Sequence, residues 1–104
     1  MVNVTKHATK RIRERCGVNK KGTERLAQIA MDKGLTHAET TGALHEWISN
    51  KYLKEQRANN IRIYGDKCYM FRGQDLITIL TIPTAELRNI AVRNMKAKKN
   101  RLVA

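Results

Sequence analysis

The residues best suited to chemistry stand near the start of the chain, where His7, Arg11 and Arg15 recur every four positions. This step places them along one side of a helix, which turns about 100° per residue. Arginines bind phosphate oxygens through paired hydrogen bonds, and a nearby histidine can exchange a proton near neutral pH. The pattern therefore indicates an anion-binding edge. A structural alternative is equally open, in which the arginines pair with carboxylates such as Glu14 or Glu24.

A second group of candidates lies on an alternating segment further along the chain. Arg62 and Tyr64 alternate with Ile61 and Ile63, so the polar pair shares one strand face and the apolar pair the other. An exposed aromatic ring beside an arginine forms a platform on which nucleobases stack. We expect Arg62 and Tyr64 to form such a platform, whereas Phe71 is more typical of core packing.

The charge balance favours an anionic partner. The 104 residues include 21 Lys and Arg against 9 Asp and Glu, a formal net charge of +12. Residues 1–25 hold eight cations and two acids, residues 61–104 hold nine and three, and the middle is neutral. Such a footprint attracts nucleic-acid phosphates, with an acidic protein or anionic lipid as alternative partners. We expect the two basic segments to meet in one groove lined by the opening helix and the sheet.

The hydrophobic periodicity predicts an α+β fold, in which N-terminal helices pack on a small antiparallel sheet of three to four strands, with a C-terminal helix. The helices are expected over 4–15, ending at Gly17, then from a cap at Asn19 to Gly34, and over 36–57, where Thr36 and Glu39 have capping-box spacing.

The strands are expected in the second half, where the apolar residues alternate. Segments 61–64, 67–72 and 76–82 are rich in β-branched and aromatic residues and are separated by glycine turns. Pro83 then ends the sheet, and Thr84 can cap the last helix. We expect the basic tail, residues 96–101, to fray.

Metal, cofactor and membrane functions lack their usual motifs. Cys16 and Cys68 are far apart and outside any CxxC pair, which predicts reduced thiols. His37 and His45 have no matching ligands nearby, so we expect no metal and no cofactor. No stretch approaches the roughly 20 apolar residues that cross a bilayer, and the first residues contain no apolar signal core. These features predict a cytoplasmic protein.

Several features occur together in one known family. They are His7-Ala8 with Arg11 and Arg15 on the opening helix, followed by segments 61–64, 68–71 and 76–80. This combination resembles the barnase/EndoU/colicin/RelE-like ribonuclease superfamily, and looks closest to its small bacterial and phage members. The resemblance covers most of the chain and implies a single domain over 1–104 with a basic C-terminal tail. It also implies metal-independent RNA cleavage, typically by a toxin that travels with an inhibitor protein.

The resemblance suggests roles for the candidate residues. His7 would be the general base or acid, and Arg11 and Arg15 would stabilise the charge that develops when a 2′-hydroxyl attacks phosphorus. Tyr64 is the further catalytic candidate. The long third helix and the lack of a clear acid–base pair in the strands depart from the family pattern. The residues expected to bind nucleic acid are Lys6, Lys10, Arg62, Lys67, Arg72 and Lys98.

Two other functions stay open at this point. One is a phage or mobile-element protein that binds RNA or DNA without cutting it. The other is an anti-defence protein whose basic face binds a host protein or blocks a host ribonucleoprotein. Salt-sensitive binding without cleavage would favour the former, and stoichiometric binding to one large protein the latter.

Overall fold

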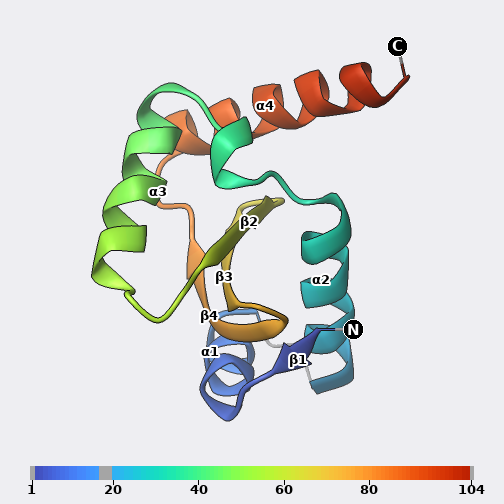
Figure 1. Ribbon diagram of the computed structural model, residues 1–104, viewed down its shortest axis with the longest axis vertical. Coiled ribbons are helices and arrows are strands. Elements are labelled where there is room, and N and C mark those ends of the chain that lie inside the picture. Colours follow the sequence, from blue (N-terminus) through green and yellow to red (C-terminus); the bar gives the residue numbers. More distant parts are fainter. Residues whose placement is uncertain (1, 17–19, 104) are drawn as a thin grey trace.

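A four-stranded sheet carries helices on both faces (Figure 1). The computed structural model describes residues 2–16 and 20–103, the side chains of residues 7, 11, 12, 15, 16, 20, 102 and 103 excepted. Gly17 and Asn19, the expected end and start of two helices, lie outside the described residues. In chain order the elements are β1 (Asn3–Val4), α1 (Lys6–Cys16), α2 (Lys20–Lys33), the short 3₁₀ turn η1 (His37–Glu39), α3 (Gly42–Lys54), β2 (Asn60–Tyr64), β3 (Lys67–Arg72), β4 (Asp75–Thr81) and α4 (Ala85–Val103).

The sheet confirms the predicted α+β class, with one difference in its strands. Its order is β1-β4-β3-β2, and β2, β3 and β4 pair antiparallel as expected. β1 adds a parallel edge to β4, with Val4 opposite Leu76, so the sheet is mixed. The prediction that the first helix begins at Val4 is therefore wrong. Thr5 separates strand from helix, and its hydroxyl accepts a hydrogen bond from the backbone N–H of Ala8 at 3.2 Å.

Two apolar clusters hold the helices on the sheet, one on each face. Alternation along the strands sends successive side chains to opposite faces, and β4 is buried on both, as predicted for a central strand. The cluster under α3 and α4 contains Leu35, Leu44, Ile48, Ile61, Ile63, Cys68, Met70, Ile77, Ile82, Leu87 and Ile90. The cluster under α1 and α2 contains Val4, Ala8, Ala27, Ala30, Tyr69, Phe71, Leu76 and Ile79.

The predicted third helix is divided in two. Thr36 and Glu39 form the expected capping box, but it opens only the 3₁₀ turn η1. Gly42, at the start of α3, has φ +58°, which a residue with a side chain rarely adopts. Asn94 of α4 accepts a hydrogen bond from the Thr41 backbone N–H at 3.1 Å. The expectation of one helix over 36–57 is therefore wrong, because α4 fixes a break at Thr41.

The last helix extends further along the chain than the sequence suggests. Its start is as predicted, since the Thr84 hydroxyl accepts a hydrogen bond from the Leu87 backbone N–H at 3.2 Å. The basic tail does not fray, because α4 stays helical to Val103. Lys98 ties this segment down by donating to the Gly34 carbonyl at 2.8 Å, at the end of α2.

Candidate nucleic-acid interface

The helix that carries the predicted catalytic residues packs across the sheet. His7, Arg11 and Arg15 belong to α1, and their side chains lie outside the described residues. The backbone of α1 contacts β4, and Ala8 joins the cluster around Tyr69 and Phe71. The proposed geometry of His7 beside two arginines therefore stays a prediction.

Arg62 and Tyr64 occupy a sheet face that helices already cover. Both point to the side of Tyr69 and Phe71, opposite Ile61 and Ile63, as the alternation predicts. That face packs against α1 and α2, so Arg62 and Tyr64 are half-buried and the face is not open along its length. Base stacking on these residues stays a prediction. The Arg62 Nε atom is buried and has no hydrogen-bond partner in the part of the chain that the structure describes. The Arg62 side chain as a whole is half-buried.

Tyr64 nevertheless reaches a surface recess, at the edge where β2 meets α4. It lines a hollow of about 340 Å³ together with Met95, Lys33, Lys98 and Lys99. A second hollow of about 210 Å³ shares Met95 and Lys99. The remaining residues of the two hollows are Asp32, Leu35, Ile63, Gly65, Ala91, Val92 and Lys96. We call these two hollows together the α4 groove.

The lysines at the rim of the α4 groove fall into two kinds. Lys33, Lys96 and Lys99 are exposed, and no carboxylate among the described residues lies within 4.0 Å of their amino groups. Lys98 is different, because its Nζ atom lies 3.0 Å from Glu39 Oε1 and its side chain is only 17% exposed. The amino group of Lys98, a predicted binding residue, is thus paired with a carboxylate of the protein itself. The amino groups of Lys33, Lys96 and Lys99, which the sequence pattern did not indicate, are free to bind an external anion.

Glu39 is the carboxylate that organises the tail of α4. It accepts hydrogen bonds from the Thr36 backbone N–H at 2.9 Å and from Lys98, and Arg101 lies 3.4 Å from its second oxygen. Burial alone would raise the pKa of Glu39, but the Thr36 and Lys98 hydrogen bonds outweigh it and hold the pKa below its usual 4.5. The carboxylate therefore stays charged and pairs with both cations.

The other predicted binding residues are distributed around the molecule. Lys67 pairs with Tyr64 across the β2–β3 hairpin, and its amino group lies 3.2 Å from Asp66. Arg72 is exposed at the opposite end of β3. Lys6 and Lys10 are exposed on α1 and line a separate hollow of about 260 Å³ with Val4, Thr9 and Arg13.

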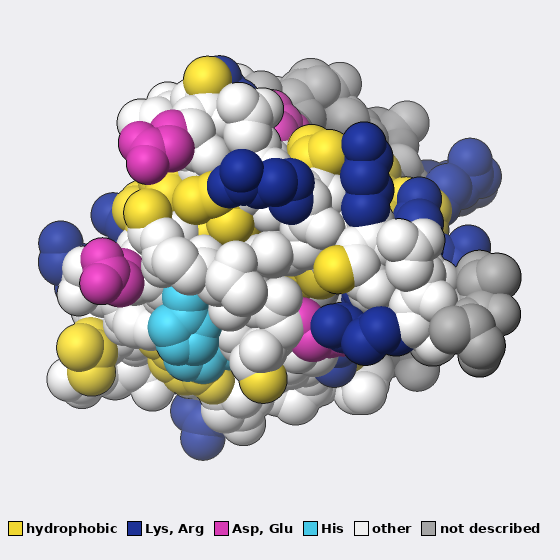
Figure 2. Space-filling view, turned by 90° about the horizontal axis from the view of Figure 1, so that it is seen from above, with side chains coloured by type: hydrophobic (Ala, Val, Ile, Leu, Met, Phe, Trp, Pro, Cys, Tyr) yellow, Lys and Arg dark blue, Asp and Glu magenta, His cyan; other side chains and the backbone are white. Residues whose placement is uncertain are grey.

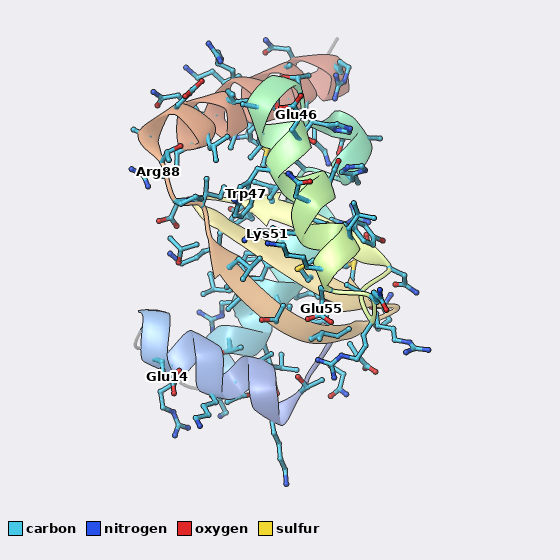
Figure 3. The ribbon with its side chains drawn as sticks, turned by 90° about the vertical axis from the view of Figure 1, so that its left-hand side faces the viewer. Glu14, Glu46, Trp47, Lys51, Glu55 and Arg88 are labelled. Carbon is cyan, nitrogen blue, oxygen red and sulfur yellow. The ribbon has the colours of Figure 1, made fainter. Side chains whose placement is uncertain are left out.

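The two most basic helices lie at opposite ends of the molecule. Figures 1 and 3 show α1 at one end of the longest axis and α4 at the other, and the molecule measures 36 Å in that direction. The expected single groove therefore does not include α4, whose six cations lie far from α1. The structure instead brings Tyr64 together with lysines of α2 and α4.

A further hollow opens on the face of α3. It measures about 480 Å³ and is lined by Trp47, Lys51, Leu80, Thr81 and Pro83. The Lys51 amino group stands 5.8 Å from the centre of the Trp47 ring. Figure 3 labels Glu46 on α3 and Glu55 directly after its last residue. Because Lys51 is the single charged residue among the described residues of its lining, this hollow suits a polyanion less well than the α4 groove.

Comparison of the chain with protein-family models, with curated proteins and with solved structures finds no match. Among the described residues, no group of three or more His, Cys, Asp or Glu side chains is placed to hold a metal ion. Within the same residues, no helix is both long and apolar enough to cross a membrane. Cys68 is a free thiol, and burial raises its pKa to about 12.

Sequence reasoning missed Lys33, Lys96 and Lys99, although part of the signal was present. Val92, Met95, Lys96 and Lys99 follow the spacing of one helix face, so a mixed apolar and basic stripe could have been noticed on the last helix. Lys33 could not have been found in this way, because the contact between the ends of α2 and α4 joins residues 64 positions apart.

Proposed function

We propose that this protein binds nucleic acid through the α4 groove. The observation that carries the proposal is a recess surrounded by three exposed lysines, Lys33, Lys96 and Lys99. None of the three has an ion-pair partner among the described residues. Cations left unpaired around a concave surface concentrate field there and attract phosphates. Figure 2 shows this end of the molecule, with Lys and Arg side chains beside exposed apolar ones.

The charge of α4 supports the same proposal. The helix has six Lys and Arg residues and one acid, Glu86. Among the described residues, Glu39 pairs with Lys98 and Arg101 and adds one negative charge. Such an excess of positive charge along one helix favours a partner with regularly spaced negative charges. Nucleic acid has such a backbone, with one phosphate for each nucleotide.

The test is a binding titration with labelled RNA and DNA at several salt concentrations. Replacing Lys33, Lys96 and Lys99 together with Gln should weaken binding about tenfold or more, and should lower the slope of log affinity against log salt by about 2, since each lost contact to a single strand removes about 0.7. The matched control replaces Lys21, Arg25 and Lys54, which are exposed elsewhere, and loses the same charge. Equal effects of the two triple variants would contradict the proposal.

We propose RNA cleavage at α1 as a second, separate function. It is supported by the contact of α1 with β4 on the sheet face that also carries Arg62 and Tyr64. In the presence of a chelator, the wild-type protein should cut labelled RNA, and His7→Ala and Arg15→Ala should abolish the cut while the proteins stay folded. Binding of RNA without cleavage would contradict the ribonuclease proposal and favour a protein that binds nucleic acid without cutting it. Stoichiometric capture of a host protein, unaffected by added RNA, would instead favour antagonism of a host complex.

A further inference from the structure

The floor of the α4 groove is apolar, although its rim is basic. Val92 is 52% exposed, and half-buried Met95 is one of the residues that both hollows share. Leu35 and Ile63 belong to the core cluster under α3 and α4 and line the hollow of about 210 Å³. Phosphate contacts alone need no apolar surface, and a phosphate pressed into this floor would lose hydration without compensation. The recess therefore suits a group that is flat and weakly polar.

Tyr64 adds an aromatic wall to this recess. It ends β2, is half-buried against the cluster under α1 and α2, and lines the hollow beside Met95 and Lys99. Because this packing restrains the side chain, a base that stacks on the ring costs little additional ordering. Aromatic rings that line a basic groove are the typical contacts of unpaired bases.

On the basis of the nucleic-acid binding proposed above, we infer that the α4 groove takes single-stranded nucleic acid, with an unpaired base between Tyr64 and Met95 and the flanking phosphates on Lys33, Lys96 and Lys99. A duplex presents its phosphates outward and keeps its bases stacked, so it can reach the lysines but cannot fill the recess. Double-stranded nucleic acid should bind by charge alone.

The experiment compares three labelled ligands of equal length and similar charge by fluorescence anisotropy: a single strand of thymidines or uridines, a hairpin duplex, and an abasic single strand. The wild-type protein should bind the base-containing single strand about tenfold more tightly than the abasic strand, since one stacked base contributes roughly this much. Tyr64→Leu should remove that difference by weakening the binding of the base-containing strand. Tyr64→Phe should restore it, because the ring is kept.

A matched pair of apolar substitutions separates the groove from the rest of the surface. Val92 lines the groove, whereas Leu53 is 75% exposed on α3. Val92→Ser should weaken binding of the base-containing strand, and Leu53→Ser should not. Thermal unfolding confirms that each variant is folded before its affinity is interpreted.

The outcomes distinguish this inference from the function on which it rests. If the three ligands bind equally and Tyr64→Leu has no effect, but the triple lysine variant still lowers affinity, the base-binding inference is overturned and nucleic-acid binding stands. If no ligand binds in a salt-dependent way, both are overturned. Tighter binding of the duplex than of the single strand would also overturn the inference.

Discussion

The α1 surface and the α4 groove have similar charge but different surroundings. α1 contains five Lys and Arg residues and one acid, and α4 contains six and one. On α1, exposed Lys6, Lys10 and Arg13 border a shallow hollow with Val4 and Thr9. On α4, the lysines border apolar side chains and Tyr64. Charge alone therefore identifies the basic helices. The shape and the polarity of the surface between the cations determine which ligand each helix can bind.

The largest effect should be a loss of stability at Gly34, which lies between the end of α2 and β2 and accepts a hydrogen bond from Lys98 of α4. A Cβ atom at this position would lie 2.5 Å from the Ala30 carbonyl oxygen and 3.0 Å from that of Ile63. Gly34→Ala should therefore lower the free energy of unfolding by about 3 kcal/mol, because backbone must move. Urea denaturation measures this change.

Gly73 provides the control, because it has φ +59° and nothing within 4 Å of an added Cβ. Gly73→Ala should cost only about 1 kcal/mol, from the left-handed backbone conformation. Equal costs at the two glycines would show that the end of α2 does not pack as closely on β2 as the structure has it.

The second effect concerns affinity and compares the two basic surfaces directly. Replacing Lys33, Lys96 and Lys99 with Gln should weaken single-strand binding about tenfold at 150 mM salt. Replacing Lys6, Lys10 and Arg13, which border the other hollow, should weaken it only at low salt. At 150 mM salt, charges farther from the bound strand than the Debye length of about 8 Å are screened. A salt titration of both variants measures the difference. A larger loss from the α1 variant would reverse the comparison.

The third effect tests how the α4 tail is held. Glu39→Gln removes the charge that pairs with Lys98 and Arg101, and should cost about 1 kcal/mol. Because the pKa of Glu39 is below 4.5 in the folded protein, its contribution is complete above pH 4.5 and is lost as the pH falls through the folded pKa. Urea denaturation from pH 3 to 7 should show this loss in the wild type and a smaller one in Glu39→Gln.

The smallest effect involves the two histidines beside the same tail. The rings of His37 and His45 stack with centres 4.2 Å apart, and Tyr52 lies edge-on to His37. Burial, and then the charge of His45, lower the pKa of His37 below 6.5, so the folded state favours the neutral ring. Stability should therefore decrease slightly as the pH falls below about 6.5. In His37→Gln this part of the decrease should be absent from the unfolding curves.

Local patterns in the sequence predicted the sheet and the last helix well. The alternation in 61–64 and 67–72, the Gly65-Asp66 turn and the cap at Thr84 each depend on neighbours along the chain, which is why sequence periodicity was sufficient. β1 was missed because it has two residues and pairs with a strand more than 70 positions away. The break before α3 was missed because Asn94, from a different helix, bonds Thr41.

The candidate site was harder to predict for the same reason. Tyr64 was identified from its strand face, but its neighbours Lys33 and Lys99 come from the ends of two other helices. Lys98 was assigned to binding because a basic tail was expected in solvent. Its contacts with Gly34 and Glu39 are tertiary and leave no periodic trace.

We propose that single-stranded nucleic acid binds more tightly in the α4 groove than on α1. Photo-crosslinking with a single strand that carries one iodinated pyrimidine, followed by peptide mass spectrometry, tests it most directly. We expect crosslinks at Tyr64 or Met95 that disappear in the variant lacking Lys33, Lys96 and Lys99. Crosslinks found only on peptides of α1, and unchanged in that variant, would contradict it.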